Sequence, residues 1–328
     1  MENNRNKKNS LPSAEKGEKM RTVSVGLNSK TGGLVYSAAA VGVLVFSLII
    51  TLIITGAKIT QYSDLYWCLN FIASPLAIAA AVGATLAVRK VPFKHIFPVK
   101  CHPKYYLIGL LIVFGMFCSL NQINGLILQL FGKEPTEHSI KLTEYIMGLS
   151  GGRAVLALLI IAVLPAIFEE LLFRGVMLNC CREEMGGVKT IFIVGFTFSL
   201  MHGNLEQTVY QFIAGCLFAF VAVRSRSILP CILMHFINNA LTVFISLLGG
   251  WDESGNLSLS AGGNIALIVV GALALAGGII WLVLDKKSTM PKVEKEVEKN
   301  GIKNFFIFAS GGIAVFGILW ILSAFGVA

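Results

Sequence analysis

Charged side chains are scarce in this sequence. Asp, Glu, Lys and Arg make up 14% of the 328 residues, and hydrophobic residues make up 55%. A soluble domain carries about 25% charged residues, and a disordered chain is poor in hydrophobic ones. The shortage of charge therefore excludes both classes and predicts a polytopic membrane protein.

Several sequence patterns are also missing. The seven cysteines include no CxxC pair, which argues against thiolate zinc sites and thiol redox motifs. No HExxH motif is present, so an ordinary zincin is excluded. The period-2 alternation of an outer-membrane β-barrel is absent as well, and we find no internal repeat. Helices are therefore the expected spanning element.

Transmembrane helices are expected where about 20 residues run with little charge, because that length crosses a ~30 Å hydrocarbon core. The sequence predicts an all-α, polytopic membrane helical bundle of eight to nine transmembrane helices. The nine candidate spans are residues 31–57, 65–88, 105–132, 154–181, 190–205, 207–223, 227–251, 254–284 and 304–328.

The distribution of Lys and Arg predicts the orientation of these spans. With a cytoplasmic N-terminus, 22 of the 27 Lys and Arg residues fall in inside segments and four in outside segments. This bias follows the positive-inside rule. The net charge of +9 is then explained by topology and by attraction to anionic headgroups. We therefore expect membrane lipids as partners and no nucleic acid.

The predicted spans divide the chain into four parts. Residues 1–30 are expected to form a polar cytoplasmic tail without the apolar region of a signal peptide. Residues 31–132 hold the first three transmembrane helices, and residues 150–250 form a four-helix core. Residues 254–328 hold two C-terminal transmembrane helices joined by a charged loop at 285–303. Glycines and alanines between 271 and 278 would allow close helix contact there.

Three candidate spans contain ionisable residues, which cost roughly 2.5–3.5 kcal/mol each at the bilayer centre on insertion scales. Glu169, Glu170 and Arg174 lie in the fourth span, His202 in the fifth and His235 in the seventh. Counted from the nearest basic residue of an inside loop, Glu169 and His202 lie about 20 Å deep and His235 about 14 Å deep. The shared depth predicts one site built from three helices.

Helical spacing indicates how these side chains face one another. Glu170 and Arg174 are four residues apart with the acid first, the favourable order for an ion pair. Glu169 would point about 100° away from Glu170, so it is the spare acid. His235 and Asn239 also share one face. The Gly and Asn that follow His202 predict a helix break, and non-helical backbone at that depth implies a buried or wet cavity.

Other polar groups in the spans have simpler interpretations. Cys180 and Cys181 end the fourth span on the basic side, where we expect free thiols, with palmitoylation as the alternative. Amides commonly link transmembrane helices, and we expect that role for Asn121, Gln122, Asn124 and Gln211.

The clustered residues suit hydrolysis of an amide bond inside the membrane. Glu169 with His202 can hold and deprotonate a water molecule, while His235 and Asn239 can donate to a developing oxyanion. Two histidines and a carboxylate also form a Zn²⁺ ligand set, so Glu169, His202 and His235 are candidate metal ligands. Both a metal-bound and a carboxylate-activated water fit these residues. The cofactor therefore stays open between a divalent metal such as Zn²⁺ and none.

These residues form three ordered motifs. They read EELLFR at 169–174, FSLMH at 198–202 and HFINN at 235–239. The chain thereby resembles the CPBP family of CAAX-protease and bacteriocin-processing membrane proteins, also called Abi or type II CAAX prenyl endopeptidase-like proteins. That family carries E-E-x-x-x-R, F-x-x-x-H and H-x-x-x-N or D in this order. The resemblance covers roughly residues 105–250.

The resemblance implies a catalytic, CAAX-protease-like core at residues 150–250. In such a core Glu169 would activate water with His202, and His235 and Asn239 would hold the oxyanion. The residues expected to support these four are Glu170, Arg174, Phe198 and Asn238.

The leading hypothesis is an intramembrane endopeptidase of the metalloendopeptidase or glutamate type. Its substrate would be a peptide or protein with a membrane-proximal segment, cleaved in a CAAX-like reaction or in bacteriocin or peptide maturation. The short loops suggest the bacterial plasma membrane. The alternative is a non-catalytic membrane immunity or scaffold protein that retains the family fold. A proton-coupled transporter is a third hypothesis, which no inverted repeat supports.

Overall fold

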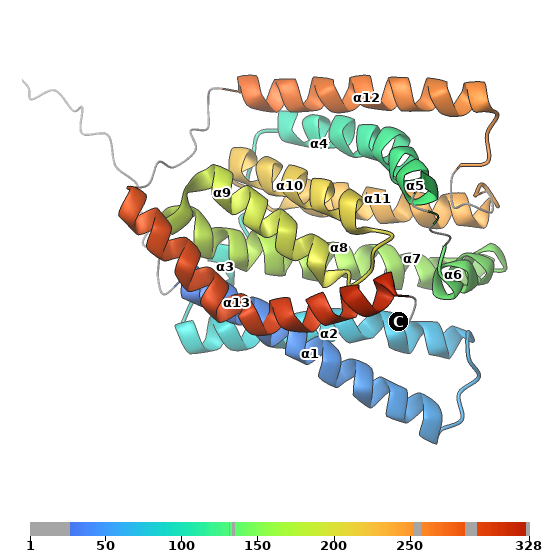
Figure 1. Ribbon diagram of the computed structural model, residues 1–328, viewed down its shortest axis with the longest axis horizontal. Helices are drawn as coiled ribbons and strands as arrows, with labels where there is room; N and C mark the ends of the chain where they lie inside the picture. The colour runs from blue at the N-terminus through green and yellow to red at the C-terminus, as the bar shows by residue number, and fades with distance from the viewer. Residues whose placement is uncertain (1–26, 131, 133–134, 252–256, 286–293, 326–328) are drawn as a thin grey trace, which may run out of the picture.

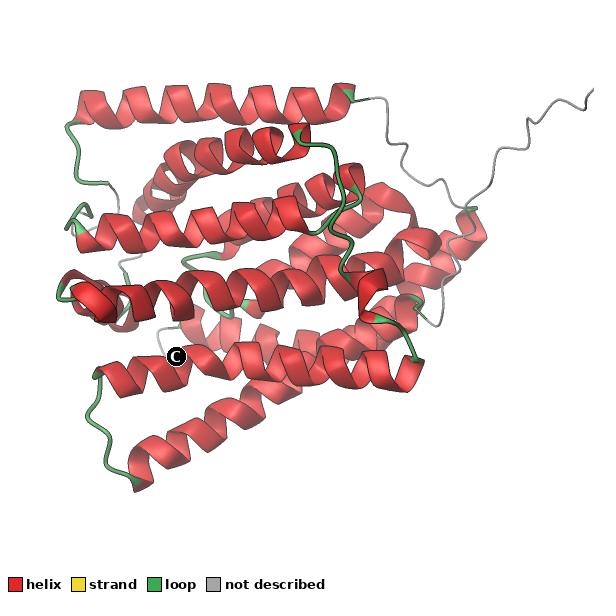
Figure 2. Ribbon diagram, turned by 180° about the vertical axis from the view of Figure 1, so that it is seen from behind, coloured by secondary structure: helices red, strands yellow, loops and turns green. Residues whose placement is uncertain are grey.

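The protein is a bundle of helices packed side by side (Figures 1 and 2). It is described from a computed structural model, in which helices form nearly all the regular structure and span-length apolar helices dominate. The predicted all-α polytopic bundle is thereby confirmed. Most of the predicted tail, residues 1–26, lies outside the described residues. The structure describes residues 27–130, 132, 135–251, 257–285 and 294–325.

The chain forms thirteen α-helices and three short π-helical segments in the described residues. The first half contains α1 (Ser29–Gly56), α2 (Asp64–Arg89), α3 (Phe93–Ile96), α4 (Lys104–Gly115), η1 (Met116–Leu120), α5 (Asn121–Leu130) and α6 (Glu137–Met147). The middle contains α7 (Gly151–Leu158), η2 (Leu159–Val163), α8 (Leu164–Glu170), η3 (Leu171–Met177) and α9 (Leu178–Met201). The remainder contains α10 (Thr208–Ser225), α11 (Leu229–Leu247), α12 (Ala261–Leu284) and α13 (Lys295–Ala324).

Eight helices in the described residues are long and apolar enough to cross a membrane. One of them, Gly151–Met201, runs for 51 residues, or about 77 Å of helix, more than twice the ~30 Å core. Gly186 interrupts it with φ 72° and ψ 165°, a conformation that glycine adopts without steric cost. The fourth and fifth predicted spans are therefore the two arms of this segment, joined at Gly186.

Two of the basic connections, residues 89–104 and 224–226, lie at one end of the bundle (Figure 1). Figure 1 shows the ends of α2 and α10 on the left, beside the start of α1, whereas α1, α5 and α11 end on the right. The Lys- and Arg-rich residues 89–104 and 224–226 follow α2 and α10. The described fold therefore has the alternating up-and-down arrangement that the positive-inside count requires.

Polar residues fix where several helices begin. The side chains of Asn28, Ser63, Thr136 and Ser260 each accept a hydrogen bond from a backbone N–H in the first turn of α1, α2, α6 and α12. Each bond satisfies a donor that has no partner within the helix. These caps determine the residue at which each helix begins, which the apolar composition alone does not specify.

Glycines bring the helices into close contact at two places. A Cβ added to Gly271 of α12 would lie 2.7 Å from Cys118 Cβ of η1, and one added to Gly278 would lie 2.7 Å from Ile112 Cγ1 of α4. A Cβ on Gly215 of α10 would lie 2.8 Å from the Cα of Gly195 in α9. The close packing predicted for residues 271–278 is confirmed, and the second contact adjoins the polar site.

The structure corrects one predicted boundary and adds one element. The charged loop expected at 285–303 ends earlier, because α13 begins at Lys295. Glu296 and Glu298 lie in its first turn, where negative charge stabilises a helix. The amphipathic helix α6, which lies between the third and fourth predicted spans, is an element that the search for apolar runs missed.

Candidate active site

The buried centre of the site is an ion pair between Glu170 and Arg174. Arg174 Nη1 lies 2.7 Å from Glu170 Oε1, and both side chains are fully buried. Arg174 Nη2 donates to the Gly215 carbonyl at 2.8 Å, and the guanidinium lies 4.8 Å from the centre of the Phe198 ring. The contact predicted from the four-residue spacing is confirmed. Through its other two contacts, Arg174 also links η3 to α9 and α10.

His235 of α11 joins this pair. Its Nδ1 lies 3.0 Å from the same Glu170 oxygen that accepts from Arg174. Its Nε2 lies 3.9 Å from Glu169 Oε2. Two successive carboxylates thus face the two nitrogens of one imidazole ring. The structure brings Glu169, Glu170 and His235 together, as their similar depth predicted.

Glu169 remains the spare acid. Its side chain is largely buried, and its Oε2 atom is buried without a hydrogen-bond partner among the described residues. A buried polar atom that lacks a partner costs free energy. This oxygen can therefore take a proton or a hydrogen bond from a molecule that enters the site.

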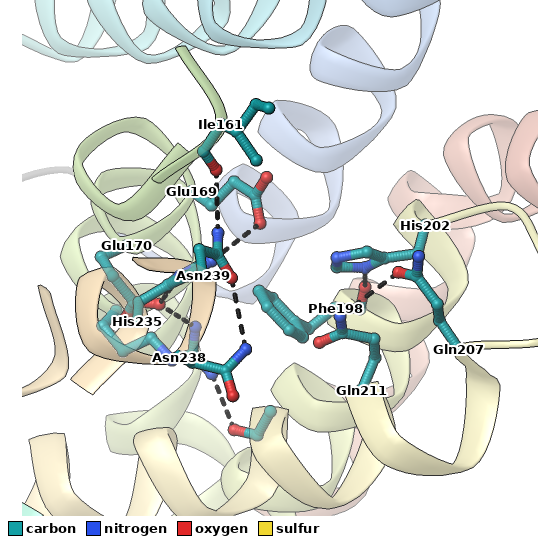
Figure 3. A network of polar contacts seen from close by, with 12 residues as sticks. Ile161, Glu169, Glu170, Phe198, His202, Gln207, Gln211, His235, Asn238 and Asn239 are labelled. Atoms are coloured by element: carbon teal, nitrogen blue, oxygen red, sulfur yellow. Dashed lines mark hydrogen bonds and ion pairs between the residues drawn. The ribbon is translucent and has the colours of Figure 1, made fainter. Parts of the chain in front are cut away.

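Phe198 lies between His202 and the other residues of the site. Its Nδ1 is 2.9 Å from the Phe198 carbonyl oxygen. The Phe198 ring centre lies 4.9 Å from that of His202 and 5.9 Å from that of His235, and Figure 3 shows the ring between the two sides of the site. In the described residues no hydrogen bond joins Glu169 to His202.

A chain of hydrogen bonds holds the amides of α11. Tyr210 of α10 donates to Asn238 Oδ1, and Asn238 Nδ2 donates to Asn239 Oδ1 at 3.2 Å. Asn239 Nδ2 in turn donates to the Ile161 carbonyl at 3.2 Å, as Figure 3 shows. Sequence reasoning named the two asparagines and missed Tyr210 and Ile161. No sequence signal marked them, because spacing within one helix does not show which residues of another helix lie opposite.

Two π-helical segments flank the two acids. The segment η2 ends six residues before Glu169, and η3 begins directly after Glu170. A π-helix has i→i+5 hydrogen bonds and is frequent at functional sites. Here η2 carries the Ile161 carbonyl that accepts from Asn239, and η3 carries Arg174. The prediction from helical spacing assumed α-helical geometry throughout. It therefore identified the partner of Arg174 but not that of Asn239.

A comparison with protein families matches the part of the chain that carries this site. Residues 151–241, less than a third of the chain, match the family described as type II CAAX prenyl endopeptidase Rce1-like. The matched segment contains all three predicted motifs. The match supports the CAAX-protease-like CPBP family for this segment. No curated protein and no solved structure matched the chain.

The Rce1-like segment spans both arms around Gly186 and continues through α10 into α11. It is narrower than the resemblance at 105–250 and covers most of the predicted core at 150–250. The helices α1–α6, α12 and α13 lie outside it. Rce1-like proteins are a protease family, so the chain carries the domain of a membrane-embedded hydrolase.

The candidate metal ligands of the Rce1-like domain do not form a ligand set. Among the residues that the structure describes, no group of three His, Cys, Asp or Glu side chains could hold a metal ion. Phe198 lies between the rings of His202 and His235. Glu169, His202 and His235 therefore do not fit a metal site in this arrangement.

The remaining polar predictions had mixed outcomes. Asn124 links two elements, since its Nδ2 donates to the Glu206 carbonyl at 2.8 Å. Gln211 pairs instead with Gln207, one turn away, at 3.3 Å. Gln122 Nε2 is buried without a partner among the described residues, and Asn121 stays a prediction. Asn124 thus joins α5 to the loop before α10, and none of these bonds in the described residues links two transmembrane helices.

The cysteine pair at the end of the fourth predicted span is buried. Cys180 is 1% exposed and Cys181 0% exposed, and both pack against Gly32 of α1. All seven cysteines are free thiols. The structure therefore confirms the expected thiols and contradicts palmitoylation at this pair, because an acyl chain has no space there.

Proposed function

We propose that this chain is an intramembrane endopeptidase in which Glu169 activates a water molecule. One observation carries the proposal: Glu169 Oε2 is buried, has no hydrogen-bond partner among the described residues, and lies 3.9 Å from His235 Nε2. The neighbouring Glu170 also has a buried oxygen, Oε2, without a partner among the described residues, but its Oε1 is already bound to both Arg174 and His235. Glu169 is thus the acid of this pair that can exchange a proton.

In the proposed reaction the water oxygen attacks the scissile carbonyl carbon while a proton passes to Glu169. His202 assists by holding the water through Nε2, since its Nδ1 is engaged with the Phe198 carbonyl. When the C–N bond breaks, the proton on Glu169 passes to the departing amine. General-base help of this kind contributes about 10²–10⁴-fold in rate.

The proposal assigns the oxyanion to His235 and Asn239. An amide nitrogen has two hydrogens, and the Asn239 bond to the Ile161 carbonyl uses one of them. Donation from His235 Nε2 requires the doubly protonated ring. In that state the two carboxylates are balanced by Arg174 and His235, which suits a low-dielectric interior.

The proposed substrate is a peptide or protein with a membrane-proximal segment, reached by way of the lipid phase. The matched family is named for prenylated CAAX proteins. For this chain we propose either that substrate class or the maturation of a bacteriocin-like peptide in a bacterial plasma membrane. Both classes place the cleaved bond close to an apolar group.

The test compares wild-type protein with Glu169→Gln. Peptidomics of cells that express each form would reveal the natural products. The purified proteins would be assayed with a quenched-fluorescence peptide ending in a farnesylated CAAX sequence and with the same peptide lacking the farnesyl group. We expect Glu169→Gln to lose at least 100-fold in rate, with normal expression and an unchanged melting temperature.

Glu183→Gln is the matched control, because Glu183 lies on the same helical segment, is half-exposed and contacts Arg182 at the surface. It should keep full activity. An arm with a chelator should also keep activity, since the proposed steps use no metal. Full activity of Glu169→Gln would contradict the catalytic assignment. Immunity or partner binding that persists in this variant without any cleavage would favour the scaffold alternative.

A further inference from the structure

The loop that follows His202 has a defined shape. α9 ends at Met201, and Gly203 adopts φ 62°, a left-handed conformation that glycine adopts readily. The Asn204 side chain accepts from the backbone N–H of Gln207 at 2.9 Å. The loop then enters α10 at Thr208. Its backbone therefore determines where the last residue of the FSLMH motif lies.

Thr208 holds this loop from within. Its hydroxyl donates to the Asn204 carbonyl at 2.7 Å, and its own carbonyl accepts from the Ser199 hydroxyl at 2.7 Å. The two bonds join the end of α9, the loop and the start of α10. A change at the Thr208 hydroxyl would therefore leave the Asn204 carbonyl without this donor.

The last helix, α13, reaches this hydroxyl. Trp320 Nε1 donates to Thr208 Oγ1 at 2.6 Å. Ser323, about one turn after Trp320, accepts through Oγ from the Leu205 N–H at 3.4 Å. Leu319, the residue before Trp320, packs against Gly203. Three residues of α13 thus contact three positions of one short loop. Figure 1 shows α13 running beside α9 towards this loop.

We propose that α13 holds the loop that carries His202, and that Trp320 is its positioning residue. α13 lies outside the matched segment 151–241, so the inference assigns a role to an element that the family comparison leaves without one. The indole N–H orients the Thr208 hydroxyl towards Asn204, and the loop then sets the direction of the His202 ring. The catalytic consequence rests on the proposed function, whereas the effect on the loop does not.

The experiment measures hydrogen exchange by mass spectrometry in peptides that cover residues 202–209 of the full-length protein. Trp320→Phe removes the N–H donor and keeps an aromatic ring. A lost hydrogen bond of ordinary strength shifts an opening equilibrium about fivefold, so exchange in these peptides should rise about fivefold. Thr208→Val should raise it at least as much. Thr208→Ser, which keeps the hydroxyl, should restore the wild-type rate.

The double variant separates this role from general packing. Because both residues act through one hydrogen bond, Trp320→Phe should add nothing in the Thr208→Val background, as expected for directly coupled residues. Trp281→Phe on α12 is the matched control, since that side chain is 40% exposed and distant in sequence from the loop. It should leave exchange at 202–209 unchanged.

Activity gives a second readout. With the farnesylated quenched peptide, Trp320→Phe should lower kcat about threefold and leave KM unchanged, because the loop orients a catalytic group. Wild-type exchange rates in Trp320→Phe, or effects that multiply in the double variant, would overturn the inference even if the enzyme is active. If exchange responds as expected while the wild-type protein cleaves no peptide, the proposed function fails and the positioning of the loop stands.

Discussion

Replacing Arg174 with Met removes one half of a buried ion pair and leaves the other half in place. Arg174 Nη1 lies 2.7 Å from Glu170 Oε1, with both side chains fully buried. Loss of one partner from such a pair costs about 3–5 kcal/mol, because a buried charge is left without compensation. Arg174 also supplies the donor for the Gly215 carbonyl. We therefore expect Arg174→Met to lower the free energy of unfolding by about 3–5 kcal/mol.

The companion variant Glu170→Gln removes the other charge. It keeps an acceptor oxygen for His235 but leaves the Arg174 charge unbalanced, so a similar loss is expected. The double variant Glu170→Gln/Arg174→Met carries neither charge. It should lose only about 1–2 kcal/mol, chiefly from the unpaired Gly215 carbonyl. The stability of the double variant would thus exceed that of either single variant.

Reversible unfolding in mixed detergent and SDS micelles, followed by circular dichroism, would measure these free energies. The exposed pair of Lys141 and Glu144, at 2.8 Å, provides the matched control. Breaking it should cost under about 1 kcal/mol, as for other surface pairs. Additive losses in the double variant of Glu170 and Arg174 would refute the reasoning, because they would show that the two charges do not compensate each other.

Two further predictions concern the neighbours of this pair. Tyr210→Phe removes the hydroxyl donor to Asn238 and should reduce peptide cleavage roughly tenfold, less than the 100-fold or greater loss of an oxyanion donor; unchanged kcat would contradict the role of the amide chain. Gly215→Ala would place a Cβ 2.8 Å from Gly195 Cα and should destabilise the protein by about 1–3 kcal/mol in the same unfolding assay. Gly277→Ala, which meets nothing within 4 Å, should change little, and equal effects of the two substitutions would argue against close packing of α9 on α10.

The sequence was sufficient for features that depend on spacing within one helix. Uncharged runs predicted the spans because a bilayer demands a fixed length of apolar helix. The Glu170–Arg174 contact followed from a four-residue spacing, which survives the change from α- to π-helical geometry. The break after His202 followed from Gly203, whose positive φ the structure shows.

Features that depend on the register between helices could not be predicted. Tyr210 meets Asn238 because α10 and α11 pack at one particular offset, and a single sequence contains no measure of that offset. The Asn239 contact with Ile161 depends on a π-helical segment that no residue pattern marks. The expected pairing of Glu169 with His202 was likewise drawn from depth alone, and the structure places Phe198 beside His202.

The turn at Gly186 has a consequence for which changes in length the protein can tolerate. Glu169 lies 17 residues before Gly186 and His202 lies 16 residues after it, so the two arms have nearly equal lengths. At about 1.5 Å and 100° per residue, a single residue inserted in either arm would shift one group along the membrane normal and turn it away from the other. Insertions beyond the ends of this segment, such as between α1 and α2, leave the two distances intact. Among related chains, we therefore expect insertions and deletions in the connections outside this segment. The number of residues between Glu169 and His202 should stay constant.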